Sequence, residues 1–479
     1  MSQTERPAAA VARANAPLHV VFVPFLARSH FAAVAAKAAA CGEDRATTAS
    51  IVTTPRFAGL APPSVPVHVA PFHFPGGQED FSLLPDEAST AQAFFAAAEA
   101  ALAPALAAAL RRHRGGAVAV VSDAVLHWAP RVARECGVPH VTFHTIGAFA
   151  AAAMVAVHLH RPGEFHEPFV VPGGFPHPVR LRRVQVNEEA LLHLPLFRAA
   201  EAESYAVVFN SFSALEAEFA EYYRTQLIGC PKKVFLVGPT RAAVSPRVDG
   251  TVAGGAERDP ILQWLDGRPA GTVVYVCFGS TCGLGASQLR ELAAGLRASG
   301  HPFLWVIPSQ PPAAGGGAER EERASSHGMV VAGRWVPQAE ILAHRAVGGF
   351  VTHCGWNSAL EAVCAGVPLA TWPLRAEQFL NEAFLVEVLR VGVRVREVAR
   401  DADLEAVVPG EAVAGAVGRL MDDGADEEAT ARRDRARELA AAARAAVADG
   451  GSSCGDWARL VDELRALNGD ENDGPIRDE

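Results

Sequence analysis

The chain has 479 residues, 50% of them hydrophobic, and a formal net charge of −10. This length exceeds one ordinary hydrophobic core and indicates two or three domains, and the apolar fraction excludes a largely disordered protein. The acidic balance argues against broad electrostatic attraction to nucleic acid or acidic membranes, so we expect neither as a partner.

The first half of the chain alternates between short apolar runs and helical segments. Residues 1–17 are Ala-rich and lack the apolar core of a signal peptide. Leu18–Phe25 predicts a buried strand, and the Ala-rich helix that follows ends near Cys41. The same alternation predicts strands at Ser50–Thr54, Ala117–Ser122 and His140–Phe143, and a helix at Trp128–Cys136.

The longest uncharged apolar run lies near Ile146–Val157. It falls short of the roughly 20 residues that span a bilayer, so it predicts a buried helix, and we expect no membrane span. The cysteines form no Cys-x-x-Cys pair, which argues against a zinc or redox motif. Scattered thiols suit a reducing compartment, and we therefore expect a cytoplasmic protein.

A second round of alternation begins after residues 241–260, whose Gly, Ala, Pro and charged residues are typical of a linker. The last segment, Gly455–Leu467, predicts an amphipathic helix. Between them we expect strands at Thr272–Phe278, Phe303–Ile307, Gly349–Thr352 and Leu369–Trp372, and a helix at Ser287–Ala298.

Continuous apolar strands that alternate with helices indicate parallel sheets covered on both faces. The predicted fold class is therefore α/β, with two doubly wound domains in tandem. Ligands of such sheets bind at the carboxyl ends of the strands, so we expect the site in a cleft between the domains. The predicted divisions are 1–240 and 261–454 for the two domains, 241–260 for the linker, and 455–479 for a terminal helix and tail that pack back on the first domain.

The most informative segment runs from Trp335 to Gln378. It predicts a strand that ends in His353, a tight turn, and a helix over Asn357–Ala365. A strand–turn–helix unit presents free backbone N–H groups and the positive end of the helix dipole, which suit a phosphate. His353 can donate to the same anion, and Glu361, one turn into the helix, can accept hydrogen bonds from a ribose diol.

Each of these residues also has an interpretation that needs no ligand. Ser358 and Glu361 have the spacing of a capping box. His353 can be a hydrogen-bonded core histidine, and Trp335 and Trp356 can be plain core aromatics.

The segment as a whole resembles the donor-binding signature of plant secondary product glycosyltransferases, a 44-residue block that begins with Trp and ends with Gln. The order WVPQ, HCGWNS, E, GVP, WP and EQ matches throughout. The resemblance implies a uridine-diphosphate-dependent glycosyltransferase of the GT-B fold, with two Rossmann-like domains, UDP-glucose as donor substrate and no cofactor or metal.

The resemblance implies roles for individual residues. Trp335 is expected to stack on uracil, with Val336 and Gln338 near the uridine, and Glu361 is expected to bind the ribose. His353, Asn357 and Ser358 match diphosphate contacts, and so does Ser280, in a strand-end turn after Cys277. Trp356, Glu377 and Gln378 match sugar contacts, the final Gln usually accompanies glucose donors, and Thr145 matches a position that reaches the sugar.

A base is needed to take the proton of the acceptor hydroxyl, and histidine titrates in the right range. His30 follows the first strand and Asp123 follows a later one, so both side chains lie at the same edge of a parallel sheet. A carboxylate behind the imidazole fixes its tautomer. The resemblance supports this catalytic pair but departs at Ser29, where glycine is usual and unusual backbone angles are better tolerated.

These residues predict a single in-line displacement that inverts the anomeric centre and forms an O-glucoside. A carbon–carbon glycosylating enzyme of the same fold and a catalytically silent UDP-sugar-binding protein stay as alternatives. The resemblance implies a monomer that acts on a small hydrophobic acceptor, such as a phenolic, flavonoid or terpenoid. Four phenylalanines are candidates for an apolar acceptor pocket or for the core: Phe165, Phe169, Phe175 and Phe197.

Overall fold

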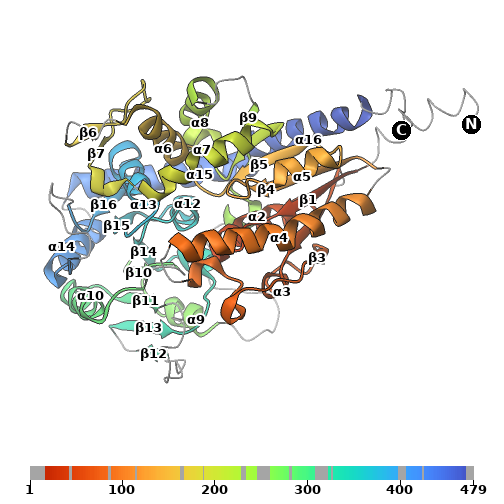
Figure 1. The fold of residues 1–479 in the computed structure, drawn as a ribbon. Coiled ribbons are helices and arrows are strands. Elements are labelled where there is room, and N and C mark those ends of the chain that lie inside the picture. The colour runs from red at the N-terminus through yellow and green to blue at the C-terminus, as the bar shows by residue number, and fades with distance from the viewer. Residues whose placement is uncertain are drawn as a thin grey trace, which may run out of the picture.

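The computed structural model of the chain contains two seven-stranded sheets, each covered by helices (Figure 1). It describes residues 17–42, 46–84, 88–113, 116–161, 167–186, 188–227, 233–244, 259–279, 283–307, 322–324, 327–397, 406–422 and 426–470.

The sheet of the first half has seven parallel strands in the order β3-β2-β1-β4-β5-β8-β9. Its central strands are rich in Val, Ile and Phe and are buried on both faces, as expected of a parallel sheet between helical layers. The strands are β1 (Leu18–Val23), β2 (Thr47–Thr53), β3 (Val67–Val69), β4 (Val118–Asp123), β5 (His140–His144), β8 (Ala206–Phe209) and β9 (Lys233–Leu236).

Helices cover both faces of this sheet, and a two-stranded hairpin of β6 (Phe169–Val170) and β7 (Arg180–Leu181) lies outside it. The predicted buried helix near Ile146–Val157 is found as α6, most of whose side chains are buried. The helices are α2 (Arg28–Cys41), α3 (Pro55–Ala58), α4 (Ala88–Arg112), α5 (Ala129–Glu135), α6 (Ala148–His160), α7 (Glu188–Ala202) and α8 (Ser213–Tyr222).

Within the described residues, one helix, Ser89–Arg112 of α4, is long and apolar enough to cross a membrane by length and composition alone. Sequence patterning overlooked this helix. Phe94, Leu102 and Leu106 are fully buried in the core that α4 shares with β1 and β4. In this fold α4 is therefore a covering helix of the first sheet.

The second half repeats the design with the strand order β12-β13-β11-β10-β14-β15-β16, in which all neighbours except β12 and β13 are parallel. Its strands are β10 (Val273–Cys277), β11 (Phe303–Ile307), β12 (Glu322–Ala324), β13 (Gly328–Ala332), β14 (Val347–Thr352), β15 (Leu369–Thr371) and β16 (Gly392–Arg394). Its helices are α9 (Pro260–Asp266), α10 (Ala286–Ala298), α11 (Gln338–Ala343), α12 (Trp356–Ala365), α13 (Gln378–Ala383), α14 (Gly410–Met421) and α15 (Glu427–Val447).

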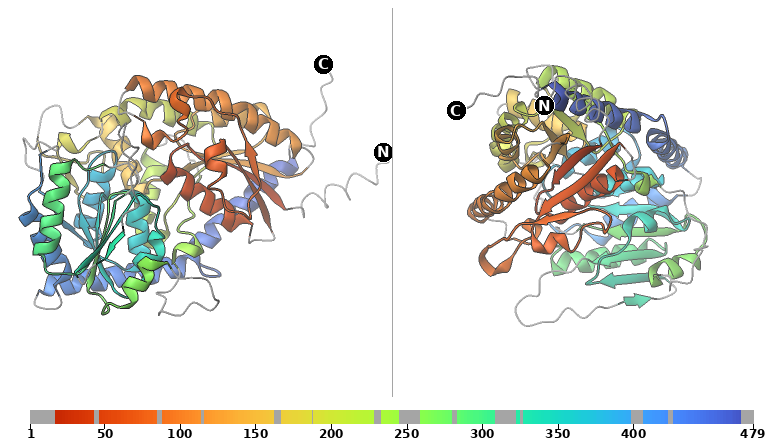
Figure 2. Two further views of the ribbon diagram at one scale, coloured as in Figure 1. Left: turned by 90° about the horizontal axis from the view of Figure 1, so that it is seen from below. Right: turned by 90° about the vertical axis from the view of Figure 1, so that its right-hand side faces the viewer.

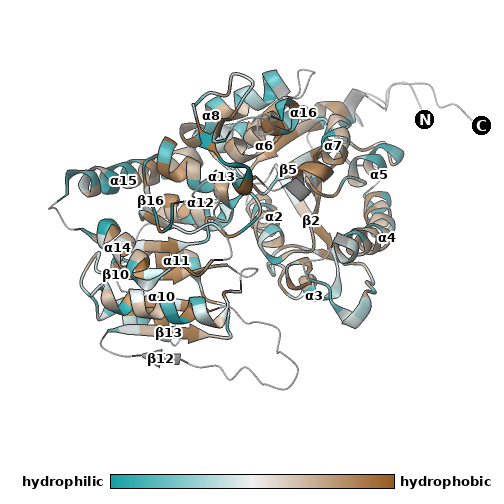
Figure 3. Ribbon diagram, turned by 60° about the vertical axis from the view of Figure 1, so that its left-hand side comes forward, coloured by the Kyte–Doolittle hydropathy of each residue, from teal (hydrophilic) through white to brown (hydrophobic). Residues whose placement is uncertain are grey.

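The two halves lie side by side, and the strands of both sheets are mostly hydrophobic, whereas helices such as α15 carry many hydrophilic residues (Figures 2 and 3). This arrangement confirms the predicted fold class of two Rossmann-like α/β units. The predicted linker, 241–260, falls mostly outside the described residues.

The last helix, α16 (Ser452–Asp470), returns to the first half (Figure 1). Trp457, Leu460 and Leu464 belong to the same core as Leu18, at the start of β1. The ammonium group of Lys37, in α2, lies 4.2 Å from the centroid of the Trp457 ring.

Candidate active site

The carboxyl ends of β1 and β4 bring together the predicted histidine–aspartate pair. His30 lies in the first turn of α2, and Asp123 is the last residue of β4. The Nδ1 atom of His30 lies 2.8 Å from Oδ2 of Asp123 and 2.9 Å from Oγ1 of Thr145. The Asp123 side chain is 1% exposed and that of His30 is 27% exposed. Because Nδ1 is engaged by Asp123, Nε2 is the ring nitrogen that can serve a ligand.

The surroundings of His30 favour its protonated form. Burial lowers the pKa of His30, but the carboxylate of Asp123, with a smaller contribution from Glu377, outweighs burial and raises this pKa above 6.5. The ring of Phe25 meets the imidazole edge-on, with ring centroids 5.5 Å apart. A histidine with a fixed tautomer and a raised pKa is suited to accept a proton near neutral pH.

Ser29, the departure from the family pattern, needs no unusual backbone angle. It lies inside the first turn of α2, and it is absent from the non-glycine residues with positive φ. The backbone conformation before His30 is thus one that serine adopts as readily as other residues.

His353 follows β14 and is held between two glycines. A Cβ atom on Gly279 would lie 2.6 Å from the imidazole, and one on Gly355 would lie 2.5 Å from its Nε2. Burial, and then the charge of Arg375, lowers the pKa of His353 to about 4, so the ring is neutral at physiological pH. Its Nδ1 atom is buried and has no hydrogen-bond partner among the described residues. The alternative of a hydrogen-bonded core histidine does not fit this nitrogen.

The capping-box interpretation of Ser358 and Glu361 is wrong. The N-cap of α12 is Gly355, which makes Ser358 the third residue of the helix, and no side chain caps the helix. A capping box needs its serine at the N-cap. The first N–H groups of α12 therefore point to the end of β14 without a side-chain acceptor of their own helix.

The hydroxyl of Ser358 and the carboxylate of Glu361 are joined by Gln338. The Nε2 of Gln338 donates to Oγ of Ser358 at 3.0 Å and to Oε2 of Glu361 at 2.8 Å. Tyr275 donates its phenolic hydrogen to Oε1 of Gln338 at 3.1 Å. Burial raises the pKa of Glu361. Gln338, Ser358 and Glu361, with the nearby Val336, line one end of the candidate donor site.

The two tryptophans of this segment have different surroundings. Trp335 is 60% exposed, so it is not a core aromatic, and the guanidinium carbon of Arg28 lies 4.4 Å from its ring centroid. Trp356 is 4% exposed, and its indole N–H donates to the carbonyl oxygen of Asn210 at 2.9 Å. The core-aromatic alternative therefore fits Trp356, whose indole hydrogen is already used.

Glu377 and Gln378 precede and begin α13. The Oε1 atom of Gln378 accepts the N–H groups of Leu374 and Arg375 at 2.9 and 3.0 Å. These bonds hold a loop in which Ala376 has a φ of +56°. Burial raises the pKa of Glu377, and the nearby His30 acts in the opposite direction. The loop thus presents the Glu377 carboxylate toward the histidine of the other half.

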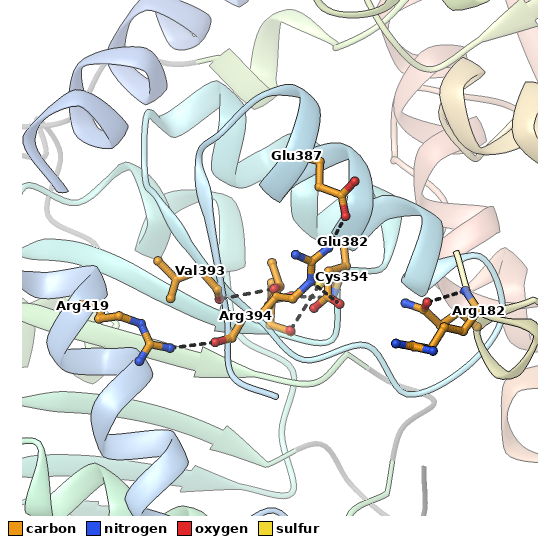
Figure 4. Close-up of polar contacts among 10 residues, drawn as sticks. Arg182, Cys354, Glu382, Glu387, Val393, Arg394 and Arg419 are labelled. Carbon is orange, nitrogen blue, oxygen red and sulfur yellow. Dashed lines mark hydrogen bonds and ion pairs between the residues drawn. The ribbon is translucent and has the colours of Figure 1, made fainter. Parts of the chain in front are cut away.

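A buried polar cluster supports the turn after His353 from behind (Figure 4). Asn381 donates its side-chain N–H to the carbonyl oxygen of Cys354 at 2.9 Å, and Cys354 has a φ of +64°. The next residue, Glu382, is fully buried and accepts a hydrogen bond from Nε of Arg394 at 3.3 Å. Arg394 also donates to Glu387 at 2.6 Å. This cluster was not foreseen, because neither periodicity nor spacing links residues on α13 and β16.

One cavity of about 950 Å³ contains both groups of candidate residues. From the first half its wall includes His30 and Thr145, and from the second half it includes Trp335, Val336, Gln338, His353, Trp356, Asn357, Ser358, Glu361, Glu377 and Gln378. Asp123 lies behind His30. Ser280 lies outside the described residues. Candidate residues of the first half and of the second half therefore line the same cavity.

The first half also contributes an apolar surface to the wall of the cavity. Of the predicted phenylalanines, Phe197 lines the cavity, whereas Phe169 and Phe175 are buried in the core and Phe165 lies outside the described residues. Patterning missed the main aromatic wall, although Phe recurs densely between residues 72 and 95. This wall consists of Phe25, Phe81, Leu84, Phe95, Val125, Ile146, Val184 and Val186.

Among the described residues, no group of three or more His, Cys, Asp or Glu side chains is placed to hold a metal ion.

Known proteins resemble this chain in sequence and in fold. A family model described as "UDP-glucoronosyl and UDP-glucosyl transferase" matches residues 182–409. The chain is 37% identical to the scopoletin glucosyltransferase of Nicotiana tabacum over 361 residues, which cover 72% of this chain and 74% of that relative. It is 35% identical to the UDP-glucose flavonoid 3-O-glucosyltransferase 7 of Fragaria ananassa over 484 residues, with 94% and 96% covered.

Solved structures give the same picture. A glycosyltransferase of Glycyrrhiza uralensis, complexed with glycyrrhetinic acid 3-O-monoglucuronide, superposes with a TM-score of 0.79 at 30% identity and covers 95% of this chain and 97% of its own. A Medicago truncatula relative complexed with UDP-glucose superposes with a TM-score of 0.72 at 28% identity, with 94% and 98% covered.

Proposed function

The chain belongs to the plant UDP-glycosyltransferase family, and from this premise we propose that it transfers glucose from UDP-glucose to a hydroxyl group of a small hydrophobic acceptor, with inversion at the anomeric carbon. The observation that carries the proposal is the shared cavity, in which His30 from the first half faces the candidate donor residues of the second.

In the proposed reaction His30 is the general base. The Nδ1 atom is bonded to Asp123, so Nε2 takes the proton of the acceptor hydroxyl. The acceptor oxygen then attacks the anomeric carbon as the bond to the diphosphate breaks. A single displacement of this kind converts an α-linked donor into a β-linked product.

The departing diphosphate would be stabilised by hydrogen-bond donors at the end of β14. His353 is neutral and contributes an N–H group, Ser358 contributes a hydroxyl, and the first N–H groups of α12 add the positive end of the helix dipole. Trp335 is exposed, as a ring that receives uracil must be, and Glu361, which lines the cavity, is the proposed ribose contact. Glu377 and Gln378 are the proposed sugar contacts.

The acceptor would lie against the aromatic wall beside His30. Phe25 and Phe95 stack with centroids 5.1 Å apart and an interplanar angle of 14°, which gives this wall a flat, rigid surface. The names of the relatives include a scopoletin and a flavonoid glucosyltransferase. We extend this to an acceptor with a planar apolar body and a hydroxyl group.

We also propose that the enzyme works in the cytoplasm as a monomer. Cys136, Cys354, Cys364 and Cys454 are free thiols, which suits a reducing compartment. Light scattering on the purified protein would test the oligomeric state.

The test compares His30→Ala with His177→Ala, a matched change at an exposed histidine that pairs with Glu218 away from the cavity. With UDP-glucose and a phenolic acceptor panel, we expect His30→Ala to lose at least about 100-fold in kcat. Calorimetric UDP binding should survive in both variants. Full turnover by His30→Ala would remove the base from the mechanism. UDP binding without transfer to any acceptor by the parent chain would favour the silent sugar-nucleotide binder.

A further inference from the structure

The first turn of α12 is bound to two segments of the other half of the molecule, the first turn of α2 and the end of β8. Asn357 donates its side-chain N–H to the carbonyl oxygen of Ser29 at 2.8 Å. Its Oδ1 accepts a hydrogen bond from the side chain of Asn210 at 3.4 Å, and Asn210 also accepts the indole N–H of Trp356. Both polar ends of the Asn357 side chain therefore contact the first half, although the family resemblance assigns this residue to the diphosphate.

The carbonyl that Asn357 binds belongs to the residue directly before His30. Arg28, one residue earlier, lies over the ring of Trp335. Arg28, Ser29 and His30 are consecutive residues of one helical turn. The first two contact the second half of the molecule, and the third carries the candidate catalytic imidazole. The orientation of that turn is fixed by the second half of the molecule as well as by its own sheet.

The far side of this contact is rigid. Asn210 follows β8, and a Cβ atom on Gly238 would lie 2.3 Å from its Oδ1, so the chain leaving the first half packs directly on Asn210. Asn357 is consequently held between a tightly packed strand end and the first turn of α2.

We propose that Asn357 is a positioning residue that aims His30 at the donor, by binding the Ser29 carbonyl rather than the diphosphate. The inference rests on the proposed function, because it needs His30 as the base. A misplacement of about 1 Å can cost on the order of 100-fold in rate, which a single well-placed hydrogen bond can prevent.

The experiment measures kcat together with the affinities for UDP and for uridine in Asn357→Ala and Asn357→Leu. Leucine has a similar size and branching and adds no charge, but it cannot donate to the Ser29 carbonyl, so both variants should behave alike. We expect kcat to fall by about 10- to 100-fold, while UDP affinity changes by less than about threefold. Asn468→Ala is the control, since that amide also bonds to backbone of the first half, at Val118, outside the cavity lining.

Two outcomes would overturn the proposal. One is a loss of UDP affinity of more than about tenfold with uridine affinity unchanged, which would assign Asn357 to the diphosphate. The other is a kcat within about twofold of the parent.

A second variant keeps the test sharp if Asn357→Ala folds poorly. Asn210→Asp removes the hydrogen bond to Asn357 Oδ1 from a residue that is not among those lining the cavity. We expect it to lower kcat, and we expect its effect on kcat to be non-additive with that of Asn357→Ala. Strictly additive effects would contradict a single hydrogen-bonded unit of Asn210, Asn357 and Ser29. His30→Ala in the same assay separates the two proposals. If it abolishes turnover while Asn357→Ala does not, only the positioning role fails, and if it retains turnover, the proposed base itself fails.

Discussion

The nitrogen atoms of His30 have different surroundings, and the difference controls when the residue can act as a base. Nδ1 lies against Asp123 and Thr145, whereas Nε2 is left for a ligand. Only the form with a free electron pair on Nε2 accepts a proton. Since the pKa of His30 is raised, that form becomes dominant at a higher pH than it would in an unperturbed histidine.

This gives a prediction for the pH profile. In the parent enzyme kcat should be low at acid pH, where His30 is protonated, and should rise as the pH passes through the raised pKa. Asp123→Asn removes the strongest group that raises this pKa, so the acid limb should move to lower pH. The maximal kcat should also fall, by about 100- to 10,000-fold, because the tautomer is no longer fixed.

The control is Asp266→Asn, which changes another histidine–aspartate pair, with His344, at 3.1 Å and outside the cavity lining. It should leave the acid limb where it is. An acid limb that stays in place in Asp123→Asn would show that another group governs the profile.

At the scale of elements, the ends of β10 and β14 meet at His353 because glycines flank it. Gly279 has a φ of +71°, which side-chain-bearing residues rarely adopt, and it also lies against the imidazole. The strand ends can therefore approach each other and leave space for the ring.

We predict that Gly279→Ala displaces His353 and weakens UDP binding by at least about tenfold, with little change in uridine binding. The matched control is Gly418→Ala in α14, where a Cβ meets nothing within 4 Å. That change should leave UDP binding intact and should stabilise the helix by about 0.5–1 kcal/mol. Calorimetry with both ligands checks the pair, and equal UDP affinities in the two variants would contradict the role given to Gly279.

Sequence patterning located the elements that carry the site better than the contacts between them. The strands before His30, Asp123 and His353 were predicted because each is a continuous apolar run, which a parallel sheet requires. The capping box at Ser358 failed because the helix begins two residues before that serine, and spacing alone does not fix a helix start.

Contacts between the two halves could not be predicted from local sequence patterns, for a different reason. The hydrogen bond from Asn357 to Ser29 joins residues separated by 328 positions. No local period reports such a pair, and the aromatic wall around Phe25 and Phe95 forms only once α4 lies on the first sheet.

At the scale of the whole molecule, α16 completes the core of the half in which the chain began. Leu464 is fully buried there, and the side chain of Asn468 bonds to the backbone of Val118. The ammonium of Lys37 donates to the carbonyl oxygen of Val237, directly after β9, and lies over the ring of Trp457. The three segments α2, the end of β9 and α16 therefore meet at Lys37.

Leu464→Ala should therefore lower the free energy of unfolding by about 2–5 kcal/mol. Asp462→Ala, at a neighbouring position of the same helix where the carboxylate is 76% exposed, should change it by less than about 0.5 kcal/mol. Urea denaturation followed by tryptophan fluorescence measures both. A loss of less than about 1 kcal/mol for Leu464→Ala would mean that α16 contributes little to the first core.

The position of α16 also constrains the order of biosynthesis. The strands of the first sheet are synthesised long before Trp457 and Leu464, yet these two side chains belong to the hydrophobic core that packs on that sheet. A nascent chain that has emerged only as far as β9 leaves this apolar surface uncovered until residues 457–464 have been translated. The core of the first sheet is therefore completed only after the second sheet has been synthesised.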